Sequence, residues 1–195
     1  MLSYEESLKI LKETDALLFG HFVLSSGLHS DQYVQCAKLL SQPKKAELLC
    51  GSLVEKIKKI YNDIDIVLSP AIGGIVIGYE VGRQLGVNTI FAEREDNKLI
   101  LRRGFNIPKD SKVLIVEDVI TTGKSALECL EIVKTNKASL VGFCCMIDRS
   151  DSKILIKDKI ISQIKFPLKT FTEKNLPQEL KKIPAIKPGS RSTSK

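Results

Sequence analysis

The fold is decided by one stretch of this sequence, Val113-Leu-Ile-Val-Glu117-Asp118-Val-Ile-Thr121-Thr122-Gly123-Lys124-Ser125. Its first four residues are apolar and predict a strand buried on both faces, as in a parallel sheet. Two carboxylates follow that strand, and a turn of small residues then leads into a helix at about 123–136. Ligands of open α/β sheets bind at the carboxyl ends of the strands, so we expect a binding site here.

The turn at 121–125 has the properties of a phosphate site. Gly123 lets the backbone pass close to an anion, the hydroxyls can donate, and the N–H groups of the helix start point toward the ligand. Glu117 and Asp118 would repel that phosphate and instead need hydroxyl donors or a metal-bound group. The expected ligand therefore carries a phosphate at one end and sugar hydroxyls a few ångströms away.

The same stretch is compared with two other motifs. A nucleotide-triphosphatase P-loop requires glycine five places before Gly123, where this chain has Asp118, so that motif is excluded. An ordinary strand, turn and helix would account for the threonines and the glycine. It would not account for two adjacent acids after a buried strand.

Outward from this unit, short apolar runs alternate with helical stretches, which is typical of an α/β fold. Strands are expected at 65–69, 89–92, 113–116 and 140–147, with helices at 74–86 and 123–136 between them. A capping box at Ser3 and Glu6 predicts a first helix that runs through Leu17-Leu18 and ends before Gly20. A short strand pair at 21–34 and a helix at 43–59 follow. A charged connection, 93–104, is expected to include a hairpin, and the pattern weakens past residue 150.

Composition restricts the class of protein. The chain has 195 residues, of which 43% are hydrophobic, and this size suits one domain with a core of its own. The whole net charge of +7 lies in residues 151–195, because residues 1–150 are balanced. Five cysteines without a C-x-x-C pair, and two histidines, indicate reduced thiols and no histidine-based metal cluster. No signal peptide or membrane-length apolar run is present, so we expect a cytoplasmic protein.

The central stretch resembles the phosphoribosyl diphosphate (PRPP) signature of the type I phosphoribosyltransferases. In that signature, apolar residues precede an acidic pair, two variable residues and T-T-G-x-S. The resemblance implies that the acids hold the ribose 2- and 3-hydroxyls and that the loop holds the 5-phosphate. The implied substrate-binding residues are Glu117, Asp118, Val119, Ile120, Thr121, Thr122, Gly123, Lys124, Ser125, Arg149 and Arg94. No catalytic residue and no metal ligand from the protein is assigned.

The resemblance also implies an architecture. This is the type I phosphoribosyltransferase fold, a mainly parallel Rossmann-like sheet flanked by helices with a small N-terminal hood. We expect a single domain at 1–185, with the hood at about 1–40 plus a C-terminal part and the core at about 42–150. Residues 186–195 are expected to form a flexible basic tail.

Three further segments resemble the members of this family that use orotate, and the whole resemblance covers roughly residues 3–150. They are the hood segment 20–33, the diphosphate loop 69–75 and the Ile147-Asp148-Arg149 segment, whose arginine contacts orotate in the family. The implied reaction is Mg²⁺-dependent transfer of ribose 5-phosphate from PRPP to N1 of orotate, in pyrimidine biosynthesis. It gives orotidine 5-phosphate and diphosphate. A mobile loop at about 94–103 is implied as a lid that reaches the neighbouring subunit of a homodimer.

This chain departs from the family pattern at three places. Gly73 and Ser25 stand where lysines are often found, and Glu93-Arg94-Glu95 replaces R-K-E. Lys98, Arg102 and Arg103 could supply further positive charge to the lid, alongside Arg94.

Alternative functions follow from the same donor site. The chain could act on a purine or another base, or it could be a PRPP-binding regulator that binds nucleic acid through its basic C-terminal quarter. The hood segment and Arg149 argue against the first. The absence of a helix-turn-helix or an aromatic-rich basic patch argues against the second, so neither nucleic acid nor membrane is an expected partner. Arg149 could also be an ordinary surface arginine paired with Asp148 or Asp151.

Overall fold

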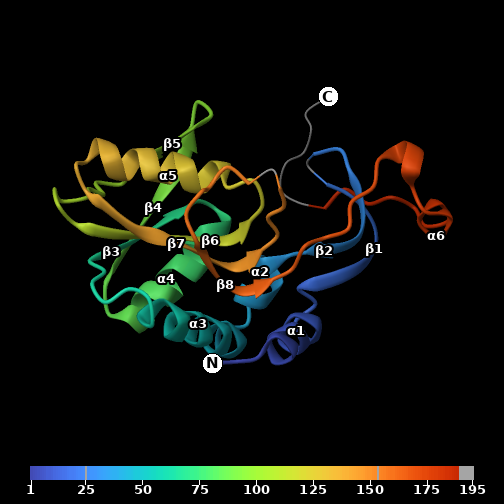
Figure 1. The fold of residues 1–195 in the computed structure, drawn as a ribbon, viewed down its shortest axis with the longest axis horizontal. Helices are drawn as coiled ribbons and strands as arrows, with labels where there is room; N and C mark the ends of the chain where they lie inside the picture. Colours follow the sequence, from blue (N-terminus) through green and yellow to red (C-terminus); the bar gives the residue numbers. More distant parts are fainter. Residues whose placement is uncertain (25, 153, 189–195) are drawn as a thin grey trace.

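The computed structural model describes residues 1–24, 26–152 and 154–188. Its main element is a six-stranded sheet in the order β5-β4-β3-β6-β7-β8 (Figure 1). The strands are Ile66–Pro70 (β3), Asn88–Glu95 (β4), Lys98–Leu101 (β5), Lys112–Ile120 (β6), Ser139–Asp148 (β7) and Ile160–Lys165 (β8). Neighbours are parallel except β4 and β5, which form the expected antiparallel hairpin. The predicted α/β fold with a mainly parallel sheet is therefore confirmed.

Helices cover both faces of this sheet. Figure 1 shows α5 (Lys124–Thr135) over one face and α3 (Pro43–Lys58) and α4 (Gly73–Leu85) over the other. Alternate side chains of β6 enter the two cores, so that Leu114 packs on the α3 and α4 side and Ile115 on the α5 side. Helix α4 lies close to the sheet at Gly78, where a Cβ would collide with the Ser69 hydroxyl.

The N-terminal segment forms a small antiparallel sheet beside the main one. Helix α1 (Tyr4–Glu13) starts at the predicted capping box and ends at Thr14, because Asp15 adopts a left-handed φ of 52°. The expectation that this helix includes Leu17-Leu18 is wrong, since both residues begin β1 (Leu17–Val23). Strand β1 pairs with β2 (His29–Val34), and the short helix α2 (Cys36–Leu40) leads into the core. Ser25 lies outside the described residues.

The C-terminal segment returns to this small sheet after β8, a strand that the sequence pattern did not reveal. Backbone hydrogen bonds join Phe171 to His29 in both directions, and Ile186 bonds to His21 and Val23. Between them lie a 3-10 turn, η1 (Glu173–Asn175), and α6 (Gln178–Lys181). Ile186 is thus paired with the hood rather than part of a free tail, and residues 189–195 lie outside the described residues. We refer to β1, β2 and the paired segment 169–186 together as the hood.

Two further observations concern the described residues. All five cysteines are buried and free of disulfide bonds, as expected for reduced thiols. None of the helices in the described part of the chain has the length and apolar character needed to cross a membrane.

Candidate active site

The candidate site lies where β6 extends beyond its neighbour β3. The register between β3 and β6 ends at Leu68 and Ile115, whereas β6 stays paired with β7 as far as Ile120 and Asp148. Glu117 and Asp118 therefore lie inside the strand, not after it as expected, and β6 lacks its β3 partner there. The start of α4 occupies the space beside Asp118. This edge of the sheet is the carboxyl edge at which a ligand was predicted.

Glu117 is held in an unfavourable electrostatic environment. Its side chain is only 7% exposed. Burial raises its pKa to about 8, and the negative charges of Asp118 and Glu128 add to that effect. Burial also raises the pKa of Asp118, although backbone N–H groups, including that of Val119, oppose the shift. Two adjacent acids whose ionisation is unfavourable indicate a site where hydroxyl donors or a cation would bind.

The raised pKa of Glu117 predicts a pH-dependent cost to stability. Because the folded chain keeps this proton to about pH 8 and the unfolded chain releases it near its ordinary value, stability falls as pH rises between those values. Between about pH 6 and about pH 9, the free energy of unfolding of the wild type should fall by roughly 2–3 kcal/mol more than that of Glu117→Gln. Urea titrations of the ligand-free proteins measure this gap. A gap that stays constant with pH would contradict the assignment.

The phosphate loop begins immediately after β6. Thr121 and Thr122 are exposed, whereas Gly123 is buried at a left-handed φ of 78° and forms the N-cap of α5. No side chain among the described residues caps α5, so the N–H groups of its first turn are available to an anion. Lys124 is exposed beside them and Ser125 is half-buried. The structure therefore places the whole predicted loop, 121–125, next to the acidic pair.

Residues 154–156, which sequence analysis missed, pack against this loop at Thr122 and Gly123. A Cβ on Gly123 would lie 2.7 Å from two side-chain carbons of Ile156, so only glycine fits. The N–H of Leu155 also donates to the carbonyl of Thr122 over 2.9 Å. The available signal was the apolar triplet 154–156 in a segment whose pattern is otherwise weak.

Arg149 follows β7 directly and lies beside the end of β6. Its backbone N–H donates to the carbonyl of Ile120 over 2.8 Å, which anchors it to the end of β6. Its Nε is buried and has no hydrogen-bond partner among the described residues. A buried donor of this kind is costly unless a ligand accepts from it.

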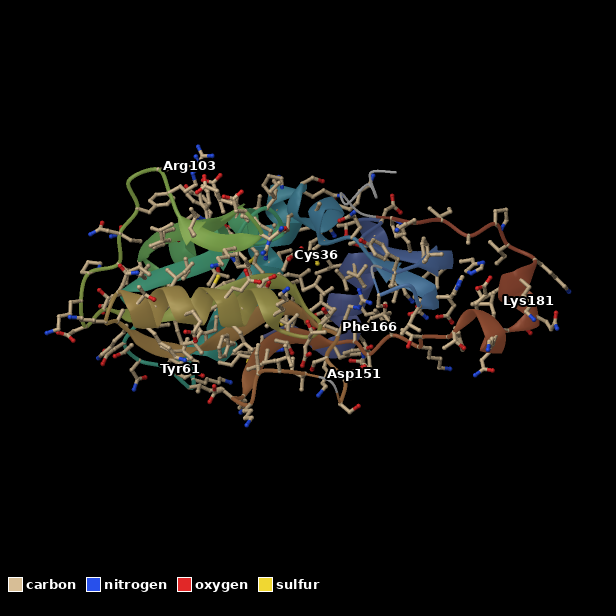
Figure 2. The ribbon with its side chains drawn as sticks, turned by 90° about the horizontal axis from the view of Figure 1, so that it is seen from above. Cys36, Tyr61, Arg103, Asp151, Phe166 and Lys181 are labelled. Carbon is tan, nitrogen blue, oxygen red and sulfur yellow. The ribbon has the colours of Figure 1, made fainter. Side chains whose placement is uncertain are left out.

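The hood contributes neighbours to Arg149 that the sequence did not identify. Burial lowers the pKa of Arg149 and raises that of Tyr33, and the two groups interact electrostatically with each other and with Cys36. The thiol of Cys36 also contacts the backbone carbonyl of Asp118 at 3.8 Å. Figure 2 shows Cys36 in the middle of the molecule, between the main sheet and the hood. The hood therefore closes one side of the site.

Arg94 is placed differently from the other predicted residues. Its guanidinium bonds to Glu128 on α5 at 3.0 Å and to the carbonyl of Asn97 at 2.6 Å. Glu128 also accepts from the N–H of Leu99, so this cluster fastens the β4–β5 hairpin to α5. Arg102 forms an exposed ion pair with Glu95 of β4, and Arg103 pairs with the half-buried Glu93 of the same strand. Figure 2 shows Arg103 at the edge of the molecule. The structure thus brings together 117–125 and Arg149, with Arg94 bound to the neighbouring hairpin.

This fold and site are those of a known class of enzymes. The profile of the phosphoribosyl transferase domain matches residues 38–175. Among solved structures, orotate phosphoribosyltransferase from Aeropyrum pernix superposes with a TM-score of 0.65 at 24% identity, covering 80% of this chain and 91% of that one. Adenine phosphoribosyltransferase from Leishmania tarentolae gives 0.60 at 18% identity, covering 92% and 93%. The chain belongs to the phosphoribosyltransferase family.

Sequence relatives define its place within that family. Orotate phosphoribosyltransferase of Caldanaerobacter subterraneus subsp. tengcongensis is 46% identical over 96% of this chain and 97% of that protein. The enzyme of the same name from Chlorobaculum parvum is 44% identical over 99% of each chain. Identity at this level over nearly the full length assigns the chain to the orotate phosphoribosyltransferases.

Proposed function

We propose that this protein transfers ribose 5-phosphate from PRPP to N1 of orotate and releases diphosphate. The observation that carries the proposal is the joining of two subsites at the end of β6. An acidic pair suited to sugar hydroxyls is followed within one turn by a helix start suited to phosphate. The unpartnered Nε of Arg149 then provides a place for the orotate carboxylate.

The donor half of the site fixes the ribose. Glu117 and Asp118 accept hydrogen bonds from the 2- and 3-hydroxyls, while the 121–125 loop and the first N–H groups of α5 bind the 5-phosphate. With both ends of the sugar held, the anomeric carbon faces the base. Displacement at that carbon passes through a transition state with oxocarbenium character, so a fixed ribose geometry lowers the barrier.

The donor set also fits Mg²⁺ brought in by the substrates. In the described part of the chain, no group of three or more His, Cys, Asp or Glu side chains could hold a metal ion alone. Glu117 has acids as its principal charged neighbours, so a divalent cation nearby would relieve their repulsion. When bound, Mg²⁺ neutralises charge on the departing diphosphate and takes most of its ligands from substrate oxygens.

The acceptor half is formed by the end of β7 and the hood. Arg149 offers donors to the orotate carboxylate, Thr121 lies exposed beside it, and Tyr33 approaches from β2. The β4–β5 hairpin with the loop to Arg103 is the proposed lid. Its ion pair between Arg102 and Glu95 is solvent-exposed and therefore weak enough to exchange for diphosphate, whereas Arg103 is held by the half-buried Glu93 through two hydrogen bonds. Lid closure would exclude water that hydrolyses the donor.

A homodimer is part of the proposal, and α4 offers a surface for it. Ile72, Val76 and Tyr79 are 84%, 49% and 64% exposed and follow one helix face at a spacing of three or four residues. This stripe starts at the diphosphate loop, so a second copy packed on it would stand beside the active site. The free thiols fit a reducing compartment, which supports a cytoplasmic location.

The stripe on α4 predicts a variant that separates the subunits. Tyr79→Glu places a charge in the centre of the apolar contact and should convert a dimer of the wild type into monomers, measured by light scattering during gel filtration. Because Tyr79 is 64% exposed, its replacement should leave each subunit folded. Ile60→Glu, at another exposed apolar residue, is the control that should remain dimeric. A dimeric Tyr79→Glu protein would place the interface elsewhere.

One assay tests the proposed reaction directly. Purified protein is incubated with PRPP and Mg²⁺ and with orotate, adenine, hypoxanthine or no base, and diphosphate release is measured together with loss of the base. Turnover with orotate alone is the expected result. Turnover with a purine would assign another base, and binding of PRPP without turnover on any base would favour a regulatory protein.

A further inference from the structure

The carboxylate of Asp118 packs directly on the backbone of Gly73, the first residue of α4. A Cβ built on Gly73 would lie 2.7 Å from Oδ2, 2.8 Å from Oδ1 and 2.9 Å from Cγ of Asp118. Real Cβ atoms essentially never approach other heavy atoms this closely. Any other residue at position 73 would therefore have to displace the carboxylate.

Space, not backbone conformation, explains this glycine. Gly73 is absent from the residues with positive φ, and it belongs to a helix, where alanine is favoured over glycine. Its neighbour Gly74 meets Pro70, Ser69 and the carbonyl of Val116, which are parts of the scaffold. Gly73 is different because the three nearest atoms that its Cβ would meet all belong to the Asp118 carboxylate.

Asp118 has little freedom to retreat from such a collision. Its backbone is fixed between Glu117 and Val119, which pair with Cys145 and Ile147 of β7. Its carbonyl contacts the Cys36 thiol on the other side. A displaced side chain would therefore have to rotate within the site, and it would turn away from the position it now holds.

We propose that Gly73 is a positioning residue, which sets the orientation of the Asp118 carboxylate toward the ribose hydroxyls of the donor. The inference rests on the proposed function, because it assigns Asp118 to PRPP. It links the diphosphate loop to the acid that holds the sugar. Related enzymes often carry lysine at this place, so by analogy a lysine should improve diphosphate binding. The geometry here predicts the opposite.

The experiment compares Gly73→Ala and Gly73→Lys with the wild type. The affinity for PRPP with Mg²⁺ is measured by calorimetry, and kcat and KM are measured with orotate. Both variants should lose about tenfold to a hundredfold in PRPP affinity and in kcat/KM for PRPP, as expected when a positioned group moves by a fraction of an ångström to about 1 Å. The melting temperature of Gly73→Ala should equal or exceed that of the wild type, because alanine favours the helix.

Gly51→Ala is the matched control. Gly51 lies inside α3, and the nearest atoms that its Cβ would meet belong to the Gln84 amide, with Oε1 at 3.0 Å and the other two at 3.9 Å. This substitution should leave PRPP affinity and turnover unchanged.

A double-mutant cycle separates positioning from a general effect of bulk. In an Asp118→Ala background the collision is gone, so adding Gly73→Ala should change PRPP affinity by less than about twofold. Wild-type affinity in Gly73→Ala, or an undiminished loss in the Asp118→Ala background, would overturn the inference. If the wild type binds PRPP but does not turn over orotate, the proposed function fails, and the same binding cycle still decides the role of Gly73.

Discussion

Asp118→Asn should lower kcat/KM for PRPP by about a hundredfold or more while the protein stays folded. The amide keeps the volume that packs on Gly73 but loses the charge and one of the two acceptor oxygens that we propose bind the ribose hydroxyls. Removing one preorganised electrostatic contact from an active site commonly costs a factor of about 10²–10³. Steady-state kinetics with PRPP as the varied substrate measures the loss.

Folding and catalysis respond to this substitution in opposite directions. Because burial raises the pKa of Asp118, replacing its charge with a neutral amide should keep or raise the melting temperature. Asp63→Asn is the matched control, since that aspartate is exposed and pairs with Lys112 away from the site. It should retain full activity. Wild-type rates in Asp118→Asn would remove the acidic pair from the mechanism.

Arg149→Ala should raise the KM for orotate by about tenfold to a hundredfold and change the KM for PRPP much less. The substitution removes charge-assisted hydrogen bonds to a carboxylate, each worth about 1.5–3 kcal/mol. Arg149→Lys keeps the charge but lacks the planar guanidinium and its Nε donor. Its KM for orotate should therefore lie between those of the wild type and Arg149→Ala. Initial rates over a grid of both substrate concentrations separate the two effects.

This test is specific because only the KM for orotate is expected to rise strongly. A merely structural arginine at the end of β7 would disturb the adjacent phosphate loop as well, and both KM values would rise together. An unchanged KM for orotate would remove Arg149 from the acceptor site. Calorimetry with orotate and the product diphosphate provides a second measurement that does not depend on turnover.

Local sequence patterns were sufficient for the donor half of the site. The stretch 113–125 encodes its own structure, because a buried strand, an acidic pair and a glycine at positive φ all follow from neighbouring residues. The helix starts at Ser3 and Pro43 were predicted for the same reason. Leu17-Leu18 fits both helical and strand spacing. No sequence pattern predicts the left-handed conformation of Asp15, which separates α1 from β1.

The rest of the site depends on pairings between distant residues. The segment 169–186 pairs with β1 and β2, more than a hundred residues earlier in the chain, and β8 is an edge strand that pairs with β7. The sequence patterns of both segments are weak. Tyr33 becomes part of the site only because β2 is folded against Arg149. Arg94 belongs to a charged run on β4, and its ion-pair partner, Glu128, lies on helix α5. None of these contacts has a local signature.

The pairing of Ile186 with β1 also affects the order in which the molecule can be completed during synthesis. A chain leaves the ribosome from its N-terminus, and domains fold as their segments emerge. The strands that carry the acidic pair and the phosphate loop are available well before Phe171 and Ile186, whose backbone bonds complete the hood. A nascent or prematurely terminated chain could therefore form the donor pocket while the side that holds the base is still open. Selectivity for the acceptor would be the last property that this enzyme acquires.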